Sequence, residues 1–320
     1  MIGTLAPLRI SFIGGGTDIP KFYNKYGGEI VACAINKYIW TFANILTEKI
    51  IILKYSKSEI LKSKKKIKHR LINQILKKYN TKSIDLNFIA DMPSRTGLGS
   101  SSTFAVSLLT ALEILSNKKI NKKKIAEIAC DVEINKLKDP IGKQDQYMSS
   151  FGGLKHIKFF KNKVQIKNIN INKKNLKKFQ NSLSLIFTGK KRDANKILIN
   201  QNYNNKKNIN NLKLMKTLVP IFIKNIKKGN IIESGKILKK NWEYKKKLNK
   251  FILNKKILKI EKKLNFKGIY GYKLLGAGGG GYFCTISNES SKKELKKKFK
   301  GNYFDVKFDF KGARKIKFSY

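Results

Sequence analysis

Residues 94–103 read Ser-Arg-Thr-Gly-Leu-Gly-Ser-Ser-Ser-Thr and lie between a predicted strand at 83–90 and a predicted helix at 100–116. The glycines let backbone N–H groups approach an anion without interference from a Cβ atom. The start of the helix adds unpaired N–H groups and the positive end of the helix dipole. The segment therefore predicts a phosphate-binding loop, although a Gly/Ser loop alone is equally consistent with a plain turn.

Three common nucleotide-binding patterns are missing from the sequence. No Gly-Lys pair completes the P-loop pattern Gly-x-x-x-x-Gly-Lys-Ser/Thr, and the His-Arg-Asp and Asp-Phe-Gly motifs of protein kinases do not occur. The run Gly-Ala-Gly-Gly-Gly-Gly at 276–281 precedes the strand-like Tyr-Phe-Cys-Thr-Ile, whereas a dinucleotide fingerprint needs a helix there. We interpret this run either as a tight β-turn or as a loop that brings backbone close to a ligand or to another loop.

The composition is that of a globular protein. The 320 residues, 41% of them apolar, are enough for two domains. No apolar run reaches the roughly 18 residues of a membrane span, and no signal peptide is evident. Three widely spaced cysteines and two histidines argue against a disulfide framework or a zinc site. We expect a cytoplasmic protein without membrane insertion.

The formal net charge of +50 makes a nucleic-acid binder one alternative. The distribution of the charge argues against it, because 89–117 and 274–291 contain no lysine while 60–80 and 160–265 are rich in it. Lysine has accumulated on segments that we expect to be solvated. We therefore expect no specific nucleic-acid partner, and we expect the charge to help attract an anionic substrate.

Hydrophobic periodicity and turn residues predict a mixture of strands and helices. The joint between two domains is expected near 170–182. Asn121 is the predicted N-cap of a helix that ends at Lys136. The predicted strands are 5–13, 29–35, 38–46, 50–54, 83–90, 154–160, 183–187, 270–275, 282–286 and 303–309, and the predicted helices are 67–79, 100–116, 121–136, several over 193–265, and 290–299.

Three segments, in this order, resemble the three motifs of the GHMP kinases, the family of galactokinase, homoserine kinase and mevalonate kinase. They are Ala6-Pro-Leu-Arg-Ile-Ser-Phe-Ile-Gly-Gly-Gly-Thr-Asp18, Pro93 through Ser102, and Lys273-Leu-Leu-Gly-Ala-Gly-Gly-Gly-Gly281. The resemblance implies an α+β fold with two domains. It implies an N-terminal domain like the second domain of ribosomal protein S5, which we place at 1–175, and a ferredoxin-like C-terminal domain, which we place at 176–320.

Within the family, the details resemble the heptose phosphate kinases. Gly14-Gly-Gly-Thr-Asp18 stands where galactokinases carry Gly-Glu-His-Thr-Asp, and Gly142-Lys-Gln-Asp-Gln-Tyr147 also resembles this subgroup. The implied activity is ATP-dependent phosphorylation of the anomeric hydroxyl of D-glycero-D-manno-heptose 7-phosphate to the 1,7-bisphosphate, for nucleotide-activated heptose and surface glycan synthesis. The alternatives are another sugar 1-kinase of the fucokinase type and a sugar sensor without catalysis.

The resemblance also implies residues that hold ATP and Mg²⁺. The Ser101 hydroxyl would ligate Mg²⁺ together with the Glu133 carboxylate; the alternative for Glu133 is an ordinary charge on a helix surface. The loop would hold the ATP phosphates through Pro93, Gly97, Leu98, Gly99, Ser100, Ser101 and Ser102.

Two residues stand where the family carries its catalytic groups. Asp145 would take the proton of the anomeric hydroxyl as that oxygen attacks the γ-phosphoryl group. Arg9 would offset charge that develops in the transition state. The alternative for Arg9 is a structural salt bridge with a nearby carboxylate.

The remaining expectations concern the sugar phosphate. The first motif implies substrate contacts from Gly15, Gly16, Thr17 and Asp18, and the glycines leave room for a bulkier sugar. The phosphate already on the substrate needs a basic site, for which Arg192 is the first choice because arginine binds phosphate in a bidentate way. Its neighbours Lys190 and Lys191, and then Arg95 and Lys143, are the further candidates. The sequence leaves the oligomeric state open.

Overall fold

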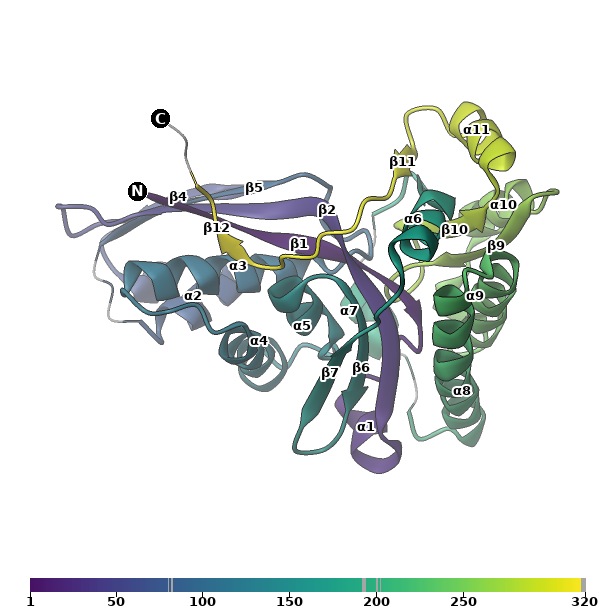
Figure 1. Cartoon of the computed structure of the whole chain (residues 1–320). Helices are drawn as coiled ribbons and strands as arrows, with labels where there is room; N and C mark the ends of the chain where they lie inside the picture. The colour runs from purple at the N-terminus through teal and green to yellow at the C-terminus, as the bar shows by residue number, and fades with distance from the viewer. Residues whose placement is uncertain (80, 82, 192–193, 200, 202, 318–320) are drawn as a thin grey trace.

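The computed structural model describes residues 1–79, 81, 83–191, 194–199, 201 and 203–317. Two β-sheets with helices packed against them give the predicted α+β fold (Figure 1). No helix in these residues is long and apolar enough to cross a membrane.

The first sheet contains most of the N-terminal half and the end of the chain. Its strands are β1 (Ile2–Ile13), β2 (Gly28–Asn44), β3 (Ile51–Lys54), β4 (Ser58–Leu61), β5 (Ile84–Ala90), β6 (Leu154–Phe159), β7 (Val164–Asn168) and β12 (Arg314–Lys315). The order is β12-β1-β2-β5-β3-β4, and β6 pairs with both β2 and β7. The helices of this half are α1 (Pro20–Tyr26), α2 (Arg70–Leu76), α3 (Ser100–Leu115), α4 (Lys122–Cys130) and α5 (Gln144–Phe151), with a 3₁₀ turn at Lys64–Lys66 and a π-helical segment at Asp131–Lys136.

The second sheet lies in the C-terminal half. Its strands are β8 (Leu183–Phe187), β9 (Ile269–Leu274), β10 (Tyr282–Ser287) and β11 (Tyr303–Asp305). The antiparallel order β11-β8-β10-β9, with helices between β8 and β9 and between β10 and β11, is the predicted ferredoxin-like arrangement. The helices are α6 (Lys173–Ser182), α7 (Ala194–Ile199), α8 (Lys206–Lys228), α9 (Ile231–Lys246), α10 (Lys255–Lys263) and α11 (Glu289–Lys298), with a 3₁₀ turn at Lys250–Ile252.

The two halves share a hydrophobic core. One cluster of buried side chains joins Phe12 and Val31 of the first sheet to Leu185 of the second sheet and Phe222 of α8. After β11 the chain returns to the first sheet, where β12 pairs with β1 (yellow segment in Figure 1). The two sheets are therefore linked by the shared core near the end of β1 and by the return of the chain to the start of β1.

The largest departure from the predicted elements is β2. The sequence predicts two strands, 29–35 and 38–46, but the structure has one strand of 17 residues. Its first part pairs with β6 and its last part with β5, while β1 runs along the other edge from Val31 to Ala43. The predicted break was wrong because the irregularity is a register shift within a strand that keeps its β1 partner.

The predicted helix 121–136 is α-helical only to Cys130 and continues as the π-helical segment. Its N-cap is confirmed, because the Asn121 side chain accepts a hydrogen bond from the Lys124 N–H. Single π turns are frequent at functional sites, and this one carries Glu133. The sequence analysis also missed α1 and α6, and it extended the last predicted strand beyond Asp305.

Candidate active site

A cavity of about 1070 Å³ lies where the first sheet, the predicted phosphate loop and the C-terminal half meet. Its walls include residues of all three glycine-containing motifs. The predicted site residues that line it are Arg9, Gly15, Gly16, Asp18, Pro93, Gly97, Gly99, Ser100, Ser101, Ser102, Glu133 and Asp145. Leu98 and Thr17 are buried outside its lining, and Arg192 lies outside the described residues.

The phosphate loop has the predicted strand–loop–helix context, between β5 and the start of α3. Gly97 and Gly99 have φ values of 86° and 80°, which favour glycine. A Cβ atom on Gly99 would lie 3.0 Å from Asp145 Oδ2, so this glycine also permits the loop to approach the predicted base. The Leu98 carbonyl accepts the backbone N–H of Arg9 at 3.0 Å, which ties the loop to β1.

The glycine run at 276–281 supports this loop from the C-terminal half. A Cβ atom on Gly281 would lie 2.0 Å from the Thr96 carbonyl oxygen, and Tyr282 N–H donates to the same oxygen at 3.2 Å. The prediction that the run lets backbone approach another loop is thereby confirmed. Gly276 and Ala277 also line the cavity.

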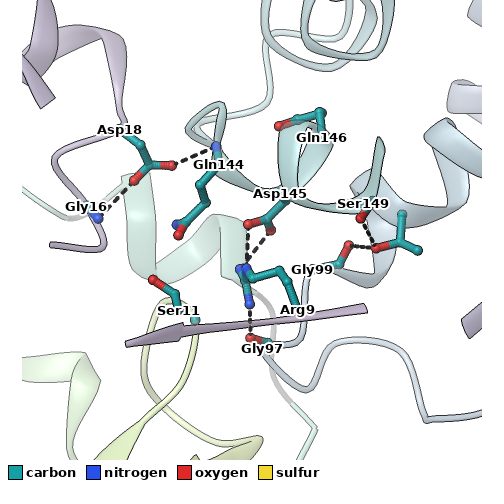
Figure 2. A network of polar contacts seen from close by, with 12 residues as sticks. Arg9, Ser11, Gly16, Asp18, Gly97, Gly99, Gln144, Asp145, Gln146 and Ser149 are labelled. Carbon is teal, nitrogen blue, oxygen red and sulfur yellow. Dashed lines mark hydrogen bonds and ion pairs between the residues drawn. The ribbon is translucent and has the colours of Figure 1, made fainter. Parts of the chain in front are cut away.

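Arg9 and Asp145 form a bidentate ion pair (Figure 2). Arg9 Nε and Nη2 donate to the two oxygens of Asp145 at 2.7 and 2.8 Å, and Nη1 donates to the Gly97 carbonyl at 2.5 Å. Arg9 is 3% exposed, whereas the Asp145 side chain is 21% exposed and lines the cavity. The salt bridge considered as the alternative for Arg9 thus exists, and its partner is the predicted catalytic base.

Glu133 is a buried carboxylate rather than a helix-surface charge. Its Oε1 accepts the Ser101 hydroxyl at 2.9 Å and its Oε2 accepts the Gln146 amide at 2.7 Å. Burial raises the pKa of Glu133 to about 7, although the surrounding hydrogen-bond donors oppose the shift. The described residues hold no cluster of three or more acidic, histidine or cysteine side chains suited to a metal. The hydroxyl and carboxylate fit a Mg²⁺ ion whose other ligands are phosphate oxygens and water.

Asp18 lies at the edge of the cavity, 1% exposed. It accepts the backbone N–H groups of Gly16 and Gln144 at 3.0 and 3.2 Å (Figure 2). Burial, and then the Asp145 carboxylate, raise the pKa of Asp18. A Cβ atom on Gly142 would lie 1.9 Å from Asp18 Oδ2, so this glycine is needed for Asp18 to reach its partners.

Thr17 has a different environment from the other first-motif residues. Its hydroxyl donates to the Gly14 carbonyl at 2.8 Å and accepts the Glu29 N–H at 3.0 Å. These bonds fix the turn after β1 against β2. The structure therefore places Thr17 beneath the cavity, and its predicted contact with a sugar stays a prediction.

The candidates for the substrate's own phosphate are dispersed. Lys191 and Arg95 line the cavity and are exposed. Lys143 lies over the ring of Tyr23, 4.9 Å from its centroid, and is not in the lining. Lys190 contributes its carbonyl oxygen to the Gly281 N–H at 2.9 Å.

The sequence analysis assigned no role to several residues that the structure brings to the site. Gln146 directly follows the predicted base in the segment 142–147, so the sequence alone could have indicated that it lies at the site. Lys273 lines the cavity at 1% exposure and donates to the carbonyls of Ser11 and Phe12 at 3.0 and 2.7 Å. Burial lowers the pKa of Lys273 to about 7.

Comparison with known proteins agrees with this architecture. The model of the GHMP kinase N-terminal domain matches residues 65–153, and the model of the GHMP kinase C-terminal domain matches 222–305. Together the two matches cover more than half of the chain. Each match lies on one of the halves described above, and the N-terminal match includes the phosphate loop, Glu133 and Asp145.

Individual relatives match nearly the whole chain. A D-glycero-α-D-manno-heptose 7-phosphate kinase of Campylobacter jejuni is 29% identical, with 98% of each protein covered. A bifunctional fucokinase/GDP-fucose pyrophosphorylase of Arabidopsis thaliana is 24% identical over 94% of this chain and 31% of its own length. The crystal structure of a D-glycero-D-manno-heptose 1-phosphate kinase from Bacteroides thetaiotaomicron superposes with a TM-score of 0.83 at 22% identity, with both chains fully covered.

These matches and the arrangement of the three motifs around one cavity lead to a single assignment. The chain belongs to the GHMP kinases and is a phosphotransferase that acts on a sugar hydroxyl.

Proposed function

We propose that the protein transfers the γ-phosphoryl group of ATP to the anomeric hydroxyl of D-glycero-D-manno-heptose 7-phosphate. The product would be the 1,7-bisphosphate, for nucleotide-activated heptose and surface glycan synthesis. The observation that carries the proposal is the Asp145 carboxylate, held by Arg9 at the cavity wall against the glycine of the phosphate loop. The similarity to the Campylobacter heptose 7-phosphate kinase supports the choice of sugar.

Asp145 serves as the base. Each carboxylate oxygen that accepts one Arg9 donor can accept a second hydrogen bond, so Asp145 can take the proton of a sugar hydroxyl while it stays paired. The hydroxyl oxygen forms the new bond to phosphorus, the bond between phosphorus and the ADP oxygen breaks, and the proton moves to Asp145. Arg9 fixes the orientation of the carboxylate and joins it to the phosphate loop through Gly97.

The phosphate loop and the start of α3 would hold the ATP phosphates through backbone N–H groups. Ser101 and Glu133 would hold Mg²⁺, which supplies charge neutralisation at the transferring phosphoryl group. Gln146 keeps the second Glu133 oxygen oriented. The cytoplasmic location predicted from the sequence belongs to this proposal, because ATP is available there.

The substrate's own phosphate would bind to exposed basic side chains at the cavity. Lys191 lines the cavity, and Arg192 follows it in the chain. Lys190, Arg95 and Lys143 remain the further candidates. An Arg192→Ala variant should raise the apparent KM for the phosphorylated sugar while leaving that for ATP unchanged, and an unchanged sugar KM would remove Arg192 from this role.

The decisive experiment is ATP turnover in a coupled assay on a panel of sugars. The panel contains heptose 7-phosphate, mannose 6-phosphate, fucose and galactose. Turnover on heptose 7-phosphate alone is expected. Turnover on an unphosphorylated sugar would replace the heptose assignment with a sugar 1-kinase of the fucokinase type, the second candidate, which the Arabidopsis relative favours. No turnover on any sugar would contradict the proposal and favour a sensor without catalysis.

A further inference from the structure

The end of the cavity beside Gly15 and Gly16 contains buried polar atoms that the protein leaves unpaired. Ser11 Oγ, Gln144 Oε1 and Gln201 Nε2 have no hydrogen-bond partner among the described residues. All three side chains line the cavity. Ser11 and Gln201 are only 3% and 7% exposed. Buried polar atoms are nearly always paired in folded proteins, so several unpaired ones at one place require an explanation.

The three side chains lie around the neighbouring glycines Gly15 and Gly16. A Cβ atom on Gly15 would lie 3.1 Å from Ser11 Oγ and 4.0 Å from both Gln144 Nε2 and Lys273 Nζ. A Cβ atom on Gly16 would lie 3.2 Å from Leu212 Cδ2 and 4.0 Å from Gln201 Nε2. Glycine at these two positions therefore leaves space beside the side chains of Ser11, Gln144 and Gln201.

This space lies next to Asp145, the proposed base. Gln144 directly precedes Asp145 at the start of α5, and its backbone N–H is bound to Asp18. In Figure 2 the Gln144 side chain lies between Asp18 and Asp145 and extends toward the strand that carries Ser11. A molecule that places one hydroxyl at Asp145 would therefore present its neighbouring groups to Ser11 and Gln144.

The chemistry of the set matches a polyhydroxylated acceptor. The Ser11 hydroxyl donates and accepts, Gln144 Oε1 accepts, and Gln201 Nε2 donates, so adjacent sugar hydroxyls could satisfy all of them. We infer that Ser11, Gln144 and Gln201 bind the hydroxyl groups that flank the reacting one and determine which sugar is accepted. This inference rests on the proposed sugar kinase activity and adds the residues that bind and select the sugar.

A purely structural role makes a different prediction for stability. If these side chains held the fold together, removing their polar atoms would lower the melting temperature. If they await a ligand, Ser11→Ala removes an unpaired buried hydroxyl and should leave the melting temperature unchanged or raise it. Thermal melting without ligand therefore separates the two roles.

The kinetic test uses the full chain and the sugar with the highest turnover in the panel. Ser11→Ala, Gln144→Leu and Gln201→Leu should each raise the KM for that sugar by about tenfold, with the KM for ATP within twofold of wild type. Ser56→Ala is the matched control, because Ser56 lines the same cavity but is not among the three nearest groups around the Cβ position of Gly15. This control should leave the KM for the sugar unchanged.

Deoxy sugars identify the hydroxyl that each residue reads. Wild type should lose about tenfold in kcat/KM on the analogue that lacks this hydroxyl, and the matching variant should lose almost nothing further. Independent, additive losses for all analogues and variants would overturn the inference, as would an unchanged sugar KM in all three variants. A wild-type enzyme inactive on every sugar would instead overturn the proposed function, so the two failures are distinct.

Discussion

The two ends of the cavity differ in how their polar groups are paired. At the catalytic end, the charged groups are hydrogen-bonded. Arg9 donates to Asp145 and to the Gly97 carbonyl, and both oxygens of Glu133 accept a side-chain donor. At the sugar end, Ser11 and Gln201 are buried with atoms that have no partner in the described residues. The catalytic end is thus preorganised before any substrate binds, whereas our inference is that the substrate completes the hydrogen bonds of the sugar end.

Because of this difference, substitutions at the two ends should change different kinetic constants. Preorganised charges need no rearrangement when the transition state forms, so substitutions there should reduce kcat. Unpaired groups stabilise a bound sugar, so substitutions there should raise KM while stability is kept. The predictions below test this division, beginning with the largest effect.

Asp145→Asn should lower kcat by about 10³-fold, because the amide cannot accept the proton of the sugar hydroxyl. Binding of ATP should persist, since the phosphate loop is separate from the substituted group. The measurement is the coupled assay together with an ATP titration. Asp91→Asn is the matched control, because Asp91 lines the same cavity but bonds the Tyr38 N–H and the Trp40 indole. Turnover of Asp145→Asn within tenfold of wild type would exclude the base role.

Glu133→Gln should raise the Mg²⁺ concentration needed for half-maximal rate by about 100-fold, because a neutral amide is a weaker ligand than a carboxylate. Gln146→Leu leaves the carboxylate but removes its 2.7 Å bond, and should raise that concentration by only about tenfold. The measurement is initial rate against Mg²⁺ after treatment with a chelator. Equal Mg²⁺ dependence in wild type and Glu133→Gln would place the metal elsewhere.

The residues of the catalytic end and the glycines of the sugar end were predictable from the sequence, whereas the unpaired polar side chains of the sugar end were not, for a physical reason. Backbone phosphate binding needs glycines at fixed spacing, so the loop at 94–103 is a local signal, and Asp145 lies in another local motif. Ser11 and Gln144 lie in two of the quoted motifs, but a polar residue in a motif does not show that its side chain is left unpaired, and Gln201 comes from a distant segment without a motif. Only the tertiary fold brings them to one space. The position of Thr17 in a motif likewise gave no sign that backbone groups bond its hydroxyl, and its predicted sugar contact stays a prediction.

Gly281→Ala should destabilise the protein by about 3 kcal/mol and loosen the catalytic end, because its Cβ atom would lie 2.0 Å from the Thr96 carbonyl oxygen. Gly301→Ala is the matched control. Gly301 also has a positive φ, 78° against 98° for Gly281, but nothing lies within 4 Å of its Cβ position. The control should cost only the backbone strain, about 1 kcal/mol. Urea unfolding measures both, and equal losses would show that the contact between the two glycine loops contributes nothing.

Lys273→Met tests whether the lysine at the sugar end stabilises β1, the strand that carries Ser11. Lys273 donates to the Ser11 and Phe12 carbonyls at an irregularity in the pairing of β1 with β2, so its loss should destabilise the fold by about 1–2 kcal/mol. Because burial lowers the pKa of Lys273 to about 7, the unfolded chain holds the extra proton between about pH 7 and the ordinary lysine pKa of about 10.4.

The unfolded state therefore binds more protons in this window, and the wild-type contribution of Lys273 to stability should increase from pH 7 to pH 10. The free energy of unfolding of wild type minus that of Lys273→Met should rise across these pH values, by on the order of 1–3 kcal/mol. Lys300→Met, at an exposed position, corrects for the loss of one surface charge. A difference that is flat or falls with pH would mean that Lys273 stays protonated in the folded protein, with its ammonium group stabilised at the sugar end of the cavity.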